Sequence, residues 1–162
     1  MSKEMRVLTL WQPWASLVVM GWKKYETRSW STPYRGTLLI HAAKRPVKNK
    51  ELSDIACKSD GQFSAVFDMN FPLGAILGCA ELTDVRKMTE TEVSTKNSIP
   101  ISSVSSQEKA VGVWLLDRYA WELNHPITFL SPIAYEGAQG LRKLHPHFGK
   151  IVKDAMRGFQ NG

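Results

Sequence analysis

The sequence is poor in cysteine and has no long apolar run, and each absence excludes a class of protein. Its 162 residues include two cysteines, Cys57 and Cys79, which are too few for a disulfide framework and lack a zinc-binding spacing. No apolar stretch reaches the ~20 residues of a membrane-spanning helix, and residues 1–6 lead into a predicted strand instead of a signal peptide. We therefore expect one domain, residues 1–162, that is cytoplasmic, has reduced thiols and has no membrane partner.

Familiar catalytic and cofactor motifs are missing too. The chain has no P-loop, no dinucleotide-binding glycine fingerprint and no G-x-S-x-G turn. His145 and His147 lie two residues apart, and no third ligand follows at a recognised spacing. We expect no metal and no other cofactor, and the sequence leaves open whether the protein is an enzyme.

Basic residues are in excess. The formal net charge is +6 and the isoelectric point is about 9.4. Such an excess attracts polyanions but does not by itself prove binding. A basic run follows a predicted strand at Lys44, Arg45, Lys48 and Lys50. As a group these side chains are suited to contact phosphates, whereas any one of them alone is typical of a solvated surface.

Hydrophobic periodicity predicts many short strands and fewer helices. The strands are expected at 7–11, 24–30, 37–42, 75–85 and 127–134, with a bent strand or strand pair over 111–116 and 119–123. Helices are expected after Pro13, after Pro46, around 63–67 and over 148–159. Residues 89–106 are rich in Ser and Thr and predict a long mobile loop.

The most distinctive segment runs from Gly21 to Arg28 and reads G-x-K-x-x-E-x-R. Glu26 and Arg28 lie two apart on a predicted strand, so their side chains share one face. Lys23 lies at the preceding turn, where alternation does not fix its direction. Two interpretations stay open: a structural ion pair, or a site in which Lys23 and Arg28 contact phosphates or bases while Glu26 orients them.

Aromatic side chains gather around this motif in the sequence. Trp11 is expected in the core, whereas Trp14, Trp22 and Trp30 are undecided between core and surface. Aromatic rings beside basic groups suit single-stranded nucleic acid, because every base has a face that can stack.

The motif and its flanks resemble the ASCH domain, named for activating signal cointegrator homology, of the PUA-like superfamily. The matching features are Gln12-Pro13, the G-x-K-x-x-E-x-R string, the block RGTLLIHA at 35–42, and the segments 73–85 and 119–144. The resemblance implies an α+β fold, a small PUA-like mixed β-barrel with flanking helices. It also implies RNA binding in a cleft that carries the motif.

The resemblance also implies that an enzyme is possible, because the family includes ribonucleases and amidohydrolases of acylated cytidine. In the amidohydrolase branch the third residue after the motif lysine is threonine, but this chain has Glu26 there. Our leading hypothesis is therefore binding of RNA or single-stranded nucleic acid, with the two enzymes as alternatives. The expected binding residues are Gln12, Trp14, Lys23, Arg28, Tyr34, His41, Lys44, Arg45, Tyr135 and Gln139, and an enzyme would use Lys23 and Glu26.

Overall fold

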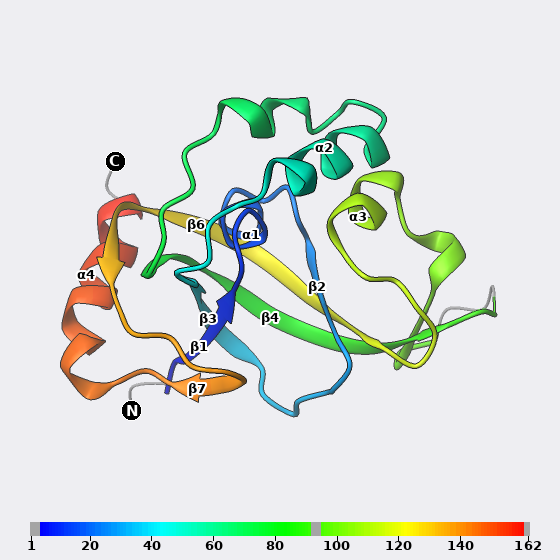
Figure 1. Cartoon of the computed structure of the whole chain (residues 1–162). Helices are drawn as coiled ribbons and strands as arrows, with labels where there is room; N and C mark the ends of the chain where they lie inside the picture. The colour runs from blue at the N-terminus through cyan, green and yellow to red at the C-terminus, as the bar shows by residue number, and fades with distance from the viewer. Residues whose placement is uncertain (1–3, 92–94, 161–162) are drawn as a thin grey trace.

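The computed structural model describes residues 4–91 and 95–160. The fold is α+β, with a curved mixed sheet and helices around it (Figure 1). The strands are β1 Arg6–Leu10, β2 Tyr25–Arg28, β3 Gly36–Ala42, β4 Ala75–Thr89, β5 Ser98–Pro100, β6 Tyr119–Ala134 and β7 Leu141–Lys143. The α-helices are α1 Trp14–Val19, α2 Asn49–Lys58, α3 Ser106–Val111 and α4 Gly149–Gln160, and short 3-10 turns occur at Ser64–Asp68, Ile101–Ser103 and Pro146–Phe148.

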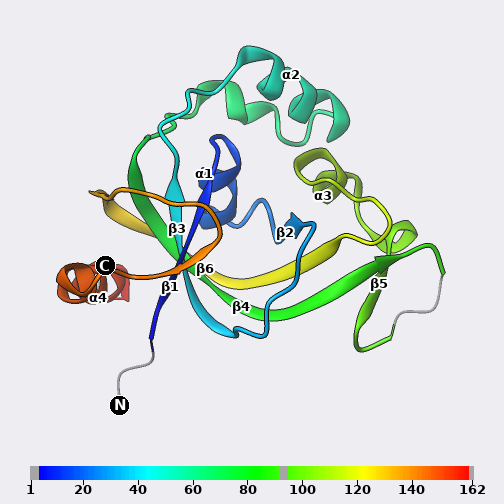
Figure 2. The ribbon, with the colours of Figure 1, turned by 60° about the horizontal axis from the view of Figure 1, so that its bottom comes forward.

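The sheet has the strand order β2-β6-β4-β3-β1-β7, and β5 pairs with β4 outside this path. The pairs β1/β3 and β4/β5 are parallel and the others are antiparallel. The long strands β4 and β6 run together along the curve of the sheet (Figure 2). Within the described residues the ladder ends at β2 and at β7, so the α+β class is confirmed but a closed barrel is not.

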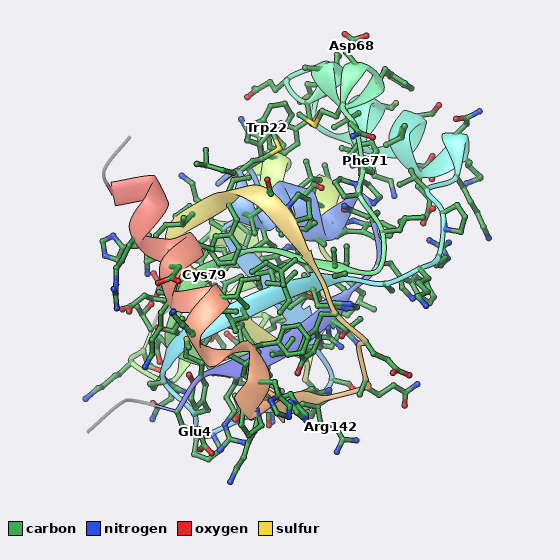
Figure 3. The ribbon with its side chains drawn as sticks, turned by 90° about the vertical axis from the view of Figure 1, so that its left-hand side faces the viewer. Glu4, Trp22, Asp68, Phe71, Cys79 and Arg142 are labelled. Carbon is green, nitrogen blue, oxygen red and sulfur yellow. The ribbon has the colours of Figure 1, made fainter. Side chains whose placement is uncertain are left out.

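The central strands are buried on both faces. Leu8 and Leu38 pack in one core cluster with residues of α1, while Val7 and Leu39 pack in another with Val152 of α4. Figure 3 shows α4 in front of the sheet in that view, with Cys79 of this second cluster labelled beside it. Burial on both faces explains why β1 and β3 read as nearly continuous apolar runs.

Helix α1 and the turn after it hold the motif in place. Gly21 ends this segment with φ +82°, a left-handed conformation that glycine adopts without strain. The chain then enters β2, whose residues Glu26 and Arg28 pair with Trp121 and Tyr119 of β6. The prediction that a glycine separates the helix from the motif strand is confirmed.

Two predicted segments differ from the structure. The stretch 89–106 contains β5, a 3-10 turn and the start of α3 instead of a long loop, although its residues 92–94 lie outside the described part. Ile99 is buried with Met88 and Trp114, which gives this Ser/Thr-rich segment an anchor that its composition hides. The predicted strand at 111–116 is wrong, because α3 ends at Val111 and the next strand, β6, begins at Tyr119.

Candidate functional site

A cleft, which we call the main cleft, opens between the sheet and the segment that joins β6 to β7. Its volume is about 740 Å³. It is lined by Thr9, Trp11, Arg28, Trp30, His41, Ala43, Lys44 and residues 135–140. Five of the predicted site residues therefore meet in one cleft: Arg28, His41, Lys44, Tyr135 and Gln139.

His41 holds the wall of this main cleft in place. It is 2% exposed, its Nε2 lies 2.7 Å from the carbonyl oxygen of Tyr135, and its Nδ1 lies 3.1 Å from Oγ1 of Thr9. A carbonyl oxygen only accepts, so we assign the proton to Nε2, and in the neutral ring Nδ1 accepts from the Thr9 hydroxyl. Burial lowers the pKa of His41, against a smaller opposing effect of the bond to Tyr135, which favours this neutral form.

Gly137 lets the wall approach His41 this closely. A Cβ atom at Gly137 would lie 2.5 Å from the His41 ring and 2.7 Å from Oγ1 of Thr9. Both contacts are far too short for any side chain, so only glycine fits here. The segment 135–140 is therefore fixed against β1 and β3 through His41 and Thr9.

Arg28 and Lys44 supply positive charge to the main cleft. The guanidinium of Arg28 lies 6.0 Å from the ring centroid of Trp30, and its Nη2 donates to the Thr9 carbonyl oxygen at 3.4 Å. Its buried Nε has no hydrogen-bond partner among the described residues. Lys44 is exposed, with its aliphatic stem beside Gly74. Both cations retain donors for an anionic ligand.

Trp11 lies at the edge of the main cleft and is 56% exposed. The expectation that it belongs to the core is wrong, because β1 ends at Leu10 and Trp11 begins the turn into α1. The guanidinium of Arg45 stacks on its ring at 4.2 Å and also contacts both carboxylate oxygens of Glu51, at 3.1 and 3.2 Å. Arg45 therefore stabilises an exposed aromatic face, and its own charge is matched by Glu51.

A second hollow, which we call the motif hollow, shares Trp11 with the main cleft. Its volume is about 480 Å³, and Trp14, Lys23 and Glu26 line it together with residues of α2 and α3. A smaller hollow of about 210 Å³ joins Glu26 to Arg28. The three charged motif residues therefore lie along a row of adjoining hollows that share Trp11, and not in a single concavity.

Lys23 connects the motif to α3. It is 2% exposed, and its Nζ donates to the carbonyl oxygen of Val111 at 2.7 Å. Burial lowers the pKa of Lys23, while the negative charges of Glu26 and Glu108 oppose that effect. Glu108 of α3 accepts from the backbone N–H of Lys24 at 2.6 Å, and burial raises the pKa of its carboxyl group. Sequence reasoning missed Glu108 because it lies 84 residues from its partner.

Glu26 is buried but only partly satisfied. Its Oε1 accepts from the backbone N–H of Thr27 at 3.0 Å and lies 3.8 Å from Nε of Arg28. Its Oε2 has no hydrogen-bond partner among the described residues. An unpaired buried carboxylate oxygen is costly, so it marks a place where a ligand donor would be favourable.

Two predicted residues lie elsewhere. Gln12 is fully buried: its Nε2 donates to Oγ of Ser16 at 2.7 Å and to the Pro72 carbonyl oxygen at 2.9 Å, and its Oε1 accepts from the Ser16 N–H. It secures α1 and has no amide edge turned to a ligand. Tyr34 lines a neighbouring hollow that shares Trp30 with the main cleft, and its hydroxyl donates to the Thr37 carbonyl oxygen.

A sequence model of the ASCH domain matches residues 8–133. The chain belongs to the ASCH domain family. Human and mouse Activating signal cointegrator 1 are each 40% identical to this ASCH domain over 80 residues. Those residues make up 48% of the chain but only 14% of the length of either relative.

Solved ASCH structures from Zymomonas mobilis have the same fold as this ASCH domain. One is 14% identical, has a TM-score of 0.53 and covers 93% of this chain and 94% of its own. A variant of that protein is also 14% identical, with a TM-score of 0.54 and coverage of 94% and 98%. At this identity the likeness establishes the fold alone. In the described part of the chain, no helix is both long and apolar enough to cross a membrane.

Proposed function

We propose that this ASCH domain binds single-stranded RNA through the main cleft. The observation that carries the proposal is the combination of two available cations, Arg28 and Lys44, with the aromatic side chains of Trp11, Trp30 and Tyr135 around one cleft. Cations follow a phosphate backbone, and aromatic rings stack on bases of any sequence.

Three further facts support this proposal. The net charge of +6 favours encounter with a polyanion. The fixed wall at His41 and Gly137 keeps the cleft open without a conformational change, which lowers the entropic cost of binding. The ASCH family is associated with RNA. A cytoplasmic location stays a prediction from the sequence.

An enzymatic alternative would use the motif hollow. A ribonuclease or an amidohydrolase of an acylated nucleoside needs a group that accepts a proton, and the unpartnered Oε2 of Glu26 supports that role. Lys23 is less suited to it, because its Nζ is buried and already donates to Val111. Binding is therefore our first proposal and hydrolysis the second.

Binding is tested by fluorescence anisotropy with a labelled single-stranded RNA octamer at several salt concentrations. Lys44→Ala should weaken binding and reduce the log–log salt slope by about 0.7, the contribution of one phosphate contact on a single strand. Lys153→Ala, which removes an exposed lysine of α4 outside the cleft, serves as the matched control and should change neither value. An absence of binding at low salt would refute the proposal.

The enzymatic alternative is tested on the same preparations. RNA incubated with the protein should stay intact on a denaturing gel, and N4-acetylcytidine should release no acetate. If either substrate is consumed and Glu26→Gln abolishes the reaction, hydrolysis becomes the first proposal. Turnover that persists in Glu26→Gln would place the activity outside the motif hollow.

A further inference from the structure

The main cleft continues into a further hollow, which we call the Tyr34 hollow. This hollow has a volume of about 600 Å³, and it shares Trp30 and Gly140 with the main cleft. Sites for single small ligands occupy about 300–1,000 Å³, so each of the two hollows is large enough for a ligand of its own. Together they form a trough that exceeds the needs of one nucleoside.

The two hollows repeat one local arrangement, an aromatic ring beside an arginine. In the main cleft the Arg28 guanidinium lies 6.0 Å from the Trp30 ring centroid. In the Tyr34 hollow the Arg6 guanidinium lies 5.6 Å from the Tyr34 ring centroid. An aromatic ring for a base and an arginine for a phosphate form the repeating unit of a single-strand binding site.

Both aromatic rings are held in place before any ligand arrives. Trp30 packs edge-to-face on the buried Trp121 with 4.9 Å between ring centroids. The Tyr34 hydroxyl donates to the Thr37 carbonyl oxygen, and burial raises the pKa of that hydroxyl. Fixed rings lose little conformational entropy when a base stacks on them.

Charge decides in which direction a strand would leave the main cleft. The side chains that line the motif hollow include as many acids as bases, namely Glu26, Glu51, Asp54, Lys23, Lys58 and Lys109. The Tyr34 hollow is lined by Arg6 and by no acidic side chain. Glu4, which accepts from Arg6 at 3.0 Å and from Lys143 at 3.1 Å, is not part of that lining. A polyanionic backbone is therefore favoured toward Tyr34 over the motif hollow.

We infer that the site takes a single RNA strand across two or more consecutive nucleotides, with one base in the main cleft and a neighbouring base against Tyr34. This inference rests on the proposed function and adds to it the length and course of the ligand. The guanidinium of Arg6 lies 5.6 Å from the Tyr34 ring centroid on a side chain that is 27% exposed, and we assign this group to the linking phosphate.

The test measures the affinities of uridine monophosphate, a dinucleotide, a tetranucleotide and an octanucleotide for the wild type and for variants, by quenching of intrinsic tryptophan fluorescence. Wild-type affinity should rise at least about fivefold from the monophosphate to the tetranucleotide, the lower end of what one more stacked base contributes. Arg6→Gln and Tyr34→Leu should remove most of this gain. Arg157→Gln, on the exposed surface of α4, is the matched control and should retain the full gain.

The outcomes separate this inference from the function beneath it. If oligonucleotides bind the wild type no better than the monophosphate does, the two-nucleotide course is refuted while RNA binding stands. The same conclusion follows if oligonucleotides bind Arg6→Gln and Tyr34→Leu as tightly as they bind the wild type. If neither the monophosphate nor any oligonucleotide binds, both this inference and the proposed RNA binding are refuted. Thermal melting checks that each variant is folded. If one variant does not fold, the comparison of ligand lengths on the wild type still decides the question. A tetradeoxynucleotide that binds as tightly as the RNA would show that the 2′-hydroxyl is not read, and the inferred restriction to RNA would then be refuted.

Discussion

Replacing Lys23 by methionine should weaken the attachment of α3 to the motif strand. Lys23 is almost fully buried, and its ammonium group donates to the Val111 carbonyl oxygen at 2.7 Å, where α3 ends. Methionine keeps most of the apolar stem but cannot donate. The substitution therefore removes one charged hydrogen bond with little change in packing volume.

The expected size of the effect follows from that bond. A hydrogen bond to a charged group contributes roughly 1.5–3 kcal/mol, and losing it leaves a buried acceptor unpaired. Glu108 would also lose the nearby positive charge of Lys23, which lowers the pKa of its carboxyl group. At roughly 2–4 °C per kcal/mol for a chain of this size, the melting temperature should fall by about 3–12 °C.

The assay is urea and thermal denaturation followed by tryptophan fluorescence, with Lys24→Met as the matched control. Lys24 is exposed, and only its backbone N–H contacts Glu108, so this control should stay within about 0.5 kcal/mol of wild type. If Lys23→Met melts like Lys24→Met, the bond to Val111 does not stabilise the fold and our reasoning is refuted.

The pH dependence provides a second check on Lys23. Burial lowers its pKa in the folded protein, so the unfolded chain binds this proton more tightly. Wild-type stability should therefore increase relative to Lys23→Met as the pH rises from the folded pKa toward the ordinary lysine value of 10.5. A difference between the two proteins that does not change with pH in the alkaline range would contradict this assignment.

Three other predictions follow from buried groups. Gly137→Ala should lower both stability and RNA affinity, because its Cβ would lie 2.5 Å from the His41 ring and displace the cleft wall. Burial raises the pKa of Glu108, so stability relative to Glu108→Gln should grow as the pH falls from 7 toward 4.5, and be lost again as the pH rises through the folded pKa. Iodoacetamide at pH 8 should modify the exposed Cys57 and spare Cys79 until urea is added, because burial raises the pKa of Cys79 to about 11.

Each of these has its own control. Gly149→Ala is matched to Gly137→Ala, since a Cβ at Gly149 meets no atom within 4 Å, and similar losses in both would contradict the role of the wall. For Glu108, a stability difference between wild type and Glu108→Gln that stays constant between pH 7 and pH 4.5 would count against its raised pKa. For Cys79, mass spectrometry that finds two modified thiols in the native protein would show that the buried thiol is accessible.

Local sequence was enough for several parts of the fold. The glycine after α1 was predictable because a left-handed residue ends a helix wherever the chain must turn. The strands β1 and β3 were predictable because both faces are buried, so their apolar runs are nearly continuous. Arg28, Lys44, Tyr135 and Gln139 were among the expected binding residues, and all four line the main cleft.

Residue type and order by themselves determined the family, the α+β class and the basic character of this ASCH domain. Tertiary structure alone decided which groups are available. In the folded chain the amide of Gln12 is buried and hydrogen-bonded at both its nitrogen and its oxygen, and Trp11 is exposed. The ammonium group of Lys23 donates to Val111 at the end of α3. The physical reason is that the partners of these side chains lie 60 and 88 residues away for Gln12 and Lys23. Local periodicity has no information on contacts at that separation, so only the folded chain distinguishes a ligand group from a structural one.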